Sequence, residues 1–224
     1  INYVHRRTKD LLTRRIVNLF DAQPGDPNFG RTTDSGPRIS QVTYDGRINY
    51  DGVVVAFRKR LSDRYQFQVS YTGSRARDNL LPGGVGSTFS NNNHPEIDFG
   101  RSNQSVPHIF VANGLVQLPF GVNVGGIVSW RSGSAFNPRG IRDLDGDGLV
   151  DQRDVAEERN DFRVEAFGNV DLRAEKEFRL PGGHRITALV EAFNLANRAN
   201  VSNVNAVSGP SFGTPTAYFP GREV

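Results

Sequence analysis

Hydrophobic and polar residues alternate along much of this chain, so that every second side chain has the same character. Between residues 65 and 77 (YQFQVSYTGSRAR), the odd positions up to 71 are aromatic or apolar, whereas the even positions up to 74 carry Gln, Ser or Thr. The same alternation runs through 122–131 and 170–179. Because successive side chains of a β-strand point to opposite faces, each stretch is predicted to be a strand with one apolar and one polar face.

Eight strand segments are predicted from this pattern and its weaker continuations. They are residues 1–7, 38–60, 65–77, 106–118, 122–132, 166–179, 184–195 and 218–224. No stretch has the apolar spacing of an amphipathic helix, and at most one short helical turn is expected, within 194–200. The chain is therefore predicted to be all-β.

The connections between these segments alternate strictly between short and long. The short ones are 61–64, 119–121 and 180–183, and the long ones are 8–37, 78–105, 133–165 and 196–217. In an antiparallel up-and-down meander, this order places every short turn at one end of the sheet and every long loop at the other. Barrels of the bacterial outer membrane are built in this way, with short periplasmic turns and long extracellular loops. The pattern predicts a partial segment of a large transmembrane β-barrel located in that membrane.

A soluble β-sandwich also alternates, because its apolar face packs inward. The alternative is therefore a secreted, calcium-stabilised β-sandwich or adhesin-type binding module. Two observations favour the barrel. Most predicted strands have 11–14 residues, which exceeds the usual ~5–6 and fits a tilted membrane crossing of ~9–11 residues. In addition, the polar positions of 171–179 are all charged, which suits a water-filled lumen.

Composition excludes several classes of partner and chemistry. The 224 residues carry a net charge of +3, which is too balanced to indicate a nucleic-acid partner. No cysteine is present, so disulfides, thiolate metal sites and cysteine nucleophiles are excluded. The longest apolar run is 53–57, far short of the ~20 residues of a membrane-spanning helix. A mean hydropathy of −0.48 still fits a barrel, because alternating strands barely raise that value.

No catalytic arrangement is recognisable, so the protein is not expected to be an enzyme. The G-x-S-x-G motif of hydrolases is absent. The four histidines, at 5, 94, 108 and 184, are too scattered to predict the convergent ligands of a zinc site. Paired catalytic carboxylates cannot be distinguished from solvated ones.

Residues 143–154 (DLDGDGLVDQRD) match the calcium-loop pattern D-x-[DN]-x-[DN]-G. The predicted ligands are Asp143, Asp145, Asp147, Leu149 through its carbonyl, Asp151 and Asp154. Carboxylates clustered this closely repel one another unless a hard cation neutralises them. Calcium is therefore the one cofactor expected, as structural support for an extracellular loop. The alternative is a solvated Asp/Gly-rich loop.

Two neighbouring stretches resemble the closing strands of TonB-dependent outer-membrane receptors. They are NVDLRAEKEFRL at 169–180 and ITALVEAFNLANRANV at 186–201, of which EAFNLANRANV is the most specific. RSGSAF at 131–136 and the segment 45–79 fit the same pattern. The resemblance covers most of 39–201 and is to the Oar-like branch, in which a carboxypeptidase-regulatory-like domain precedes the plug.

The resemblance implies a fold, a function and a set of partners. In that family about 22 strands close around an N-terminal plug, and ligands captured outside are imported with energy delivered by TonB. Residues 1–224 would be the C-terminal part of such a barrel, without the plug or the TonB-contacting box. The implied partners are outer-membrane lipid, the TonB system through the missing N-terminal part, and an unknown extracellular ligand. A start at Ile1 rather than Met agrees with a piece of a longer protein.

Overall fold

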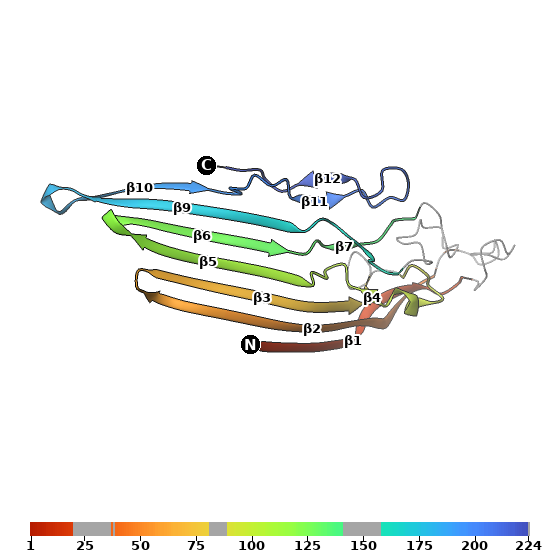
Figure 1. Cartoon of the computed structure of the whole chain (residues 1–224). Coiled ribbons are helices and arrows are strands. Elements are labelled where there is room, and N and C mark those ends of the chain that lie inside the picture. The colour runs from red at the N-terminus through yellow and green to blue at the C-terminus, as the bar shows by residue number, and fades with distance from the viewer. Residues whose placement is uncertain (20–36, 38, 81–88, 141–157, 224) are drawn as a thin grey trace.

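The computed structural model describes residues 1–19, 37, 39–80, 89–140 and 158–223. Its centre is one antiparallel sheet in which consecutive long strands lie side by side (Figure 1). In spatial order the strands are β1 (Asn2–Ile16), β2 (Ser40–Ser62), β3 (Tyr65–Asp78), β5 (His108–Leu118), β6 (Val122–Arg131), β9 (Phe167–Arg179) and β10 (Arg185–Ala192), with the short β4 (Gly100–Arg101) beside β3. The predicted all-β, up-and-down meander is confirmed. Within the described residues, β1 and β10 are the two edges, so the sheet is open.

Three short turns join the strands at one end of the sheet, as the sequence predicts (Figure 1). Asp63 and Arg64, between β2 and β3, have φ angles of 53° and 70°, the left-handed backbone that matches the twist of a tight hairpin. The other two are the 3₁₀ turns η3 (Pro119–Gly121) and η4 (Pro181–Gly183). This end is called the turn end, and the opposite end, where the long connections lie, is called the loop end.

The strand register sorts the side chains of the sheet into two faces, because directly paired residues lie on the same face. One row of paired residues is Val55, Tyr71, Phe110 and Trp130, and the adjacent row is Ala56, Ser70, Val111 and Ser129. The face that carries the first row is called the apolar face, and the face that carries the second row is called the polar face.

The apolar face is exposed. Phe57 and Val190 on this face, for example, are 63% and 62% exposed. Within the described residues, the buried hydrophobic side chains all lie away from the centres of the long strands: Ile16, Leu80, Phe89, Ala135, Val164 and Val201. Soluble proteins rarely leave so much contiguous apolar surface open. The apolar face therefore requires an apolar environment outside the chain.

The first strand is longer than predicted. It extends to Ile16 instead of ending at residue 7, so the first long connection is shorter. Asp10, with a φ of 57°, lies in a register irregularity between Thr8 and Leu11. A bulge of this kind moves the following side chains to the other face. The alternation is thus interrupted although the strand continues.

The predicted strand 218–224 is wrong. The remaining short elements are η2 (Pro95–Asp98), β7 (Ala135–Phe136), β8 (Phe162–Arg163), β11 (Val201–Val204) and β12 (Pro215–Tyr218). β11 and β12 pair with each other outside the main sheet, and beyond them a bridge between Phe193 and Glu223 joins the chain to the end of β10. Pro220 has no amide hydrogen to donate, which interrupts any longer ladder there.

The segment 194–200 forms a turn in which Asn194 and Asn197 have φ angles of 47° and 49°. No helix among the described residues is long and apolar enough to cross a membrane.

Candidate functional site

Charged side chains on the polar face form a ladder along β9 and β10. Arg173 lies at its centre and donates to Glu175 at 2.8 Å and to Glu191 at 3.4 Å. Glu175 also accepts a hydrogen bond from the side-chain amide of Asn123, on β6, at 3.2 Å. Toward the turn end the ladder continues with Glu177, Arg179 and Arg185. The glutamates of the ladder each have a cationic partner, so the ladder is charged but nearly neutral.

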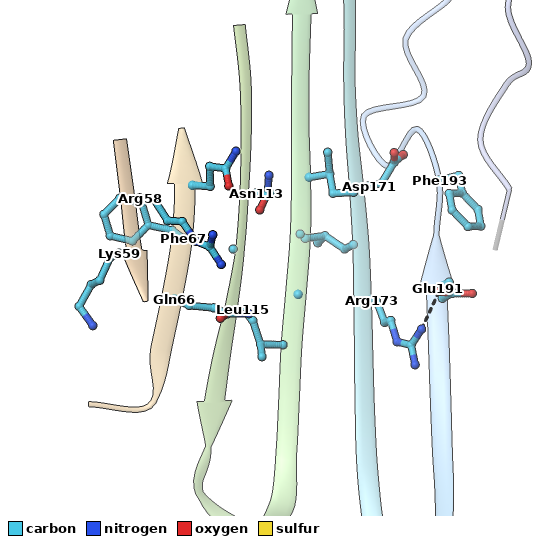
Figure 2. Close-up of a pocket in the computed structure, with 16 residues that line it drawn as sticks. Arg58, Lys59, Gln66, Phe67, Asn113, Leu115, Asp171, Arg173, Glu191 and Phe193 are labelled. Carbon is cyan, nitrogen blue, oxygen red and sulfur yellow. Dashed lines mark hydrogen bonds and ion pairs between the residues drawn. The ribbon is translucent and has the colours of Figure 1, made fainter. Parts of the chain in front are cut away.

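A cavity of about 400 Å³ opens on the polar face between β3 and β10 (Figure 2). Its lining includes Arg58, Gln66, Asn113, Leu115, Asp171, Arg173, Glu191 and Phe193. Gly125 pairs with Leu115 on one side and with Arg173 on the other, and its missing side chain leaves room between them. Small-molecule sites have volumes of ~300–1,000 Å³ and place a few polar groups among apolar ones. The cavity therefore has the size and the mixed apolar and polar lining of a small-molecule site.

Arg159 connects distant segments at the loop end, and its side chain is only 1% exposed. It donates to the Asp78 carboxylate at 2.6 Å and to the Asp98 carbonyl at 3.0 Å, and also to the carbonyls of Asp78 and Leu80. The carboxylate of Asp98 in turn accepts the amide of Ser90 at 2.7 Å. One guanidinium thus joins the end of β3, the η2 turn and the segment before β8.

A second cavity, of about 810 Å³, opens at the loop end. Its charged lining consists of Arg75, Arg77, Arg101, Arg159, Arg163 and one carboxylate, that of Glu158. Arg163 donates to the carbonyls of Ser105 and Gly133 at 2.8 and 2.9 Å. Partial burial, together with the nearby charge of Arg101, lowers the pKa of the Arg163 guanidinium. An excess of arginine in a concave site attracts anionic groups.

The family model of an outer membrane beta barrel domain matches residues 1–158 and 152–224, which together span the chain. The chain belongs to this barrel family. Among solved structures, it is similar to the outer membrane transporter YddB from Escherichia coli, with a TM-score of 0.57 and 12% identity. The match covers 98% of this chain and 28% of that transporter, so at this identity the likeness concerns the fold of one portion. No curated protein matches the chain.

Membership of the outer membrane barrel family assigns the two faces and the two ends. In such barrels the apolar face lies against lipid, the polar face lines the interior, the short turns are periplasmic and the long loops are extracellular. Polar and aromatic groups meet at both margins of the apolar face: Tyr71 and His108 share a 2.6 Å hydrogen bond, and Lys59 lies 3.7 Å from the Tyr65 ring centroid. The predicted outer-membrane location is confirmed, and the exposed apolar face supports a barrel over a secreted sandwich.

The predicted calcium ligands, Asp143, Asp145, Asp147, Leu149, Asp151 and Asp154, lie outside the described residues. Within the part of the chain that the structure describes, no group of three His, Asp or Glu side chains could hold a metal ion. His5 pairs with Asp51 at 2.6 Å and His94 with Glu96 at 3.1 Å, at separate places. A backbone hydrogen bond, assisted by His94, lowers the pKa of Glu96.

Three arginines, Arg159, Arg75 and Arg77, stand out in the structure but are not among the residues predicted from the sequence. Nothing in the sequence singles out Arg159, because its carboxylate partner lies 81 residues away. For Arg75 and Arg77 a signal exists: both occupy odd positions, and they continue the apolar face of β3 beyond Gly73. The alternation therefore predicts that these two charges point to the outside of the barrel.

Proposed function

We propose that this chain forms part of the wall of a TonB-dependent receptor that takes up an extracellular ligand. The observation that carries the proposal is the cavity of about 400 Å³ on the polar face, with its neutralised ladder of charges. The likeness to an outer membrane transporter supports it. So does the resemblance of 169–180 and 186–201 to the closing strands of these receptors.

The charge ladder suits transport because its groups can exchange partners. Arg173 is held between Glu175 and Glu191, so a polar ligand that displaces Glu175 leaves Arg173 paired with Glu191 and leaves Glu175 bonded to the Asn123 amide. Conduction requires binding that is favourable enough for entry and weak enough for release. The same pairing leaves the glutamates of the ladder without the free carboxyl group that general acid–base catalysis uses, so we infer no enzymatic role for the ladder.

The proposed partners follow from the two faces. Outer-membrane lipid surrounds the apolar face, and the unidentified ligand passes along the polar face. TonB acts through the plug part of such a receptor, and nucleic acid is not among the proposed partners. Calcium bound by 143–154 stiffens one extracellular loop.

TonB dependence is tested by crosslinking in cells. The full-length protein is produced in the outer membrane of a bacterial host, and crosslinks to the periplasmic domain of TonB are quantified. A crosslink in wild-type cells that disappears from cells lacking TonB is the expected result. If the protein is inserted and no crosslink forms, the TonB-dependent function is wrong.

The wall itself is tested with neighbouring cysteines on β5, because the chain has no cysteine of its own. Asn113 lies on the polar face and Ala112 on the apolar face. In Asn113→Cys, a water-soluble maleimide should label the residue rapidly, whereas Ala112→Cys should be protected by lipid. Equal labelling of both variants in folded protein would contradict the assignment of the faces.

Calcium binding is tested by calorimetric titration of the chain refolded in detergent. Calcium should release or absorb heat with the wild type, and the signal should vanish in Asp143→Asn/Asp147→Asn, which removes two ligand charges. A wild-type titration without heat would leave 143–154 as a solvated loop.

A further inference from the structure

The cavity of about 400 Å³ on the polar face adjoins a third cavity, of about 270 Å³, on the side of the loop end. Asp171 and Phe193 line both of them. The third cavity is also lined by Phe167 and Asn169, which alternate with other residues along β9 and therefore share the polar face with Asp171. The two cavities form one depression in the inner wall, which is called the lumen groove.

The lumen groove is elongated along the strands. At the loop end it begins at Phe219, and toward the turn end it reaches the row formed by Gln66, Leu115 and Arg173. From Phe167 to Arg173, β9 covers about 20 Å of extended chain. A groove of this length fits a chain of linked units better than a single small molecule.

The charges that line the groove nearly cancel. Arg173 is paired with Glu191, and the Asp171 carboxylate accepts a hydrogen bond from the backbone amide of Asn194 at 2.9 Å. On the polar face, the cations of the lining are Arg58 and Arg173, and the carboxylates are Asp171, Glu191 and Glu223. A ligand with several like charges meets no excess of the opposite charge here, so the groove is suited to an uncharged ligand.

Three side-chain amides of the groove have unused hydrogen-bonding capacity. Gln68 and Asn113 are directly paired in the register, and Gln66 lies on the same face of β3 as Gln68. All three residues are exposed. Among the described residues, none of the three amides has a hydrogen-bond partner. Each amide can both donate and accept, which matches a hydroxyl group because a hydroxyl also does both.

Aromatic rings are exposed on this otherwise polar wall. The extended backbone continues from Glu191 through Phe193, which bridges to Glu223, so that Phe193 shares the polar face of Glu191 (Figure 2). Phe193 is 49% exposed, and Phe219 is 36% exposed. Exposed apolar surface in water is unfavourable, and a ligand that covers it is stabilised. The negative face of an aromatic ring also attracts the positively polarised C–H groups of a ligand.

The groove thus fits a ligand that is elongated, uncharged and rich in hydroxyl groups, and whose units have C–H faces. A chain of pyranose rings has all of these properties, because its hydroxyls lie around the edges of rings whose faces carry C–H groups. A peptide of the same length carries amide groups in place of most of these hydroxyls and has no ring in each unit.

We propose that the lumen groove binds a neutral oligosaccharide. One sugar ring stacks on Phe193, and its hydroxyls and those of the neighbouring units form hydrogen bonds with Gln66, Gln68 and Asn113. The inference rests on the proposed uptake function and deepens it, because it names the chemical class of the transported ligand.

The test measures sugar binding by the purified full-length protein in detergent, without TonB. Isothermal titration calorimetry is carried out with maltohexaose, cellohexaose, mannohexaose and chitohexaose, and with a blocked hexapeptide of alanine and serine for comparison. At least one hexasaccharide should bind, and it should bind more tightly than the peptide. The corresponding monosaccharide should bind about tenfold more weakly or worse, because it leaves most of the hydrogen bonds of the groove unmade.

Substitutions separate stacking from apolar burial. Phe193→Leu keeps an apolar side chain but loses the flat ring, so the affinity should fall about three- to tenfold, whereas Phe193→Trp should keep it. Gln68→Ala/Asn113→Ala should bind about tenfold more weakly. The matched control is Phe57→Leu, which makes the same change at a lipid-facing ring that is 63% exposed and should leave the affinity unchanged.

Folding of every variant is verified by heat-modifiable mobility in electrophoresis. The proposal is wrong if none of the four hexasaccharides binds at millimolar concentration, if the peptide binds more tightly, or if Phe193→Leu binds as well as the wild type. These outcomes are distinct from a failure of the proposed function. A protein that crosslinks to TonB without binding sugar is a receptor for another ligand, whereas one that binds sugar without crosslinking has the groove but no TonB dependence.

Discussion

The two ends of this barrel segment differ in the sequence range of their polar contacts, as one cation from each end shows. At the turn end, Lys59 donates to Ser62 and to the Tyr65 carbonyl, three and six residues away. At the loop end, Arg159 donates to Asp78 and Asp98, which lie 81 and 61 residues away. The turn-end cation is partly exposed, whereas the Arg159 side chain is 1% exposed.

The difference indicates how each end depends on the rest of the fold. Contacts between residues close in sequence form whenever their own hairpin forms, since little chain entropy is lost in closing a short loop. Contacts across 60 to 80 residues require the sheet to be assembled first. The extracellular end is therefore expected to open independently of the wall, as a region of lower local stability.

The largest effect is expected from removing Arg159, the cation with the long-range contacts. Arg159→Ala leaves the Asp78 carboxylate, 8% exposed, without its partner in a buried site. Breaking a buried ion pair from one side destabilises by about 3–5 kcal/mol. Hydrogen exchange should accelerate at 89–101 and 158–163, while the central strands β5 and β6 stay protected.

The matched control for that experiment is Arg139→Ala. Arg139 is also at the loop end, but its side chain is exposed, so exchange should not change. If Arg159→Ala instead loosened β5 and β6 to the same extent, the loop end and the wall would form one cooperative unit and the contrast would fail.

A smaller effect is expected from the backbone of the turn end. Gly183 has a φ of 80°, and an added Cβ would meet nothing within 4 Å. Gly183→Ala should therefore destabilise by about 1–2 kcal/mol, purely because an L-residue disfavours this conformation. Urea unfolding in lipid vesicles measures the loss. Gly183→Asn should recover part of it, since Asn tolerates the left-handed region.

Gly221→Ala provides the control for backbone conformation. This glycine has equally open space around it but no positive φ, so its substitution should leave stability unchanged. A loss as large as that of Gly183→Ala would show that φ is not the cause.

The same contrast explains which features the sequence could predict. The strands and tight turns could be predicted because their signals are local. Side-chain alternation marks a strand within a few residues, and residues such as Pro181 and Gly182 mark a turn. The bulge at Asp10 concealed the second half of β1, since an irregular register breaks the period. The Arg159 contacts had no local signature at all. The side-chain alternation predicts that Arg75 and Arg77 point outward. That Arg77 lies in one row with Arg7 and Arg101 follows only from the register of four strands.

The smallest effect is expected at Lys59, where a substitution measures what a cation with only local contacts contributes to stability. Its ammonium group has three hydrogen bonds, at 2.6, 2.8 and 3.2 Å, and lies over the Tyr65 ring. Because the group is partly exposed and all partners belong to the same hairpin, Lys59→Met should destabilise by only about 0.5–1 kcal/mol.

Lys176 is the matched control: it is also on the apolar face, 5.0 Å from the Phe178 ring centroid, and Lys176→Met adds apolar surface against lipid. In urea unfolding, Lys176→Met should be neutral or stabilising. Equal losses in both variants would mean that each lysine acts through the membrane interface, and the local hydrogen bonds of the turn end would then contribute nothing measurable.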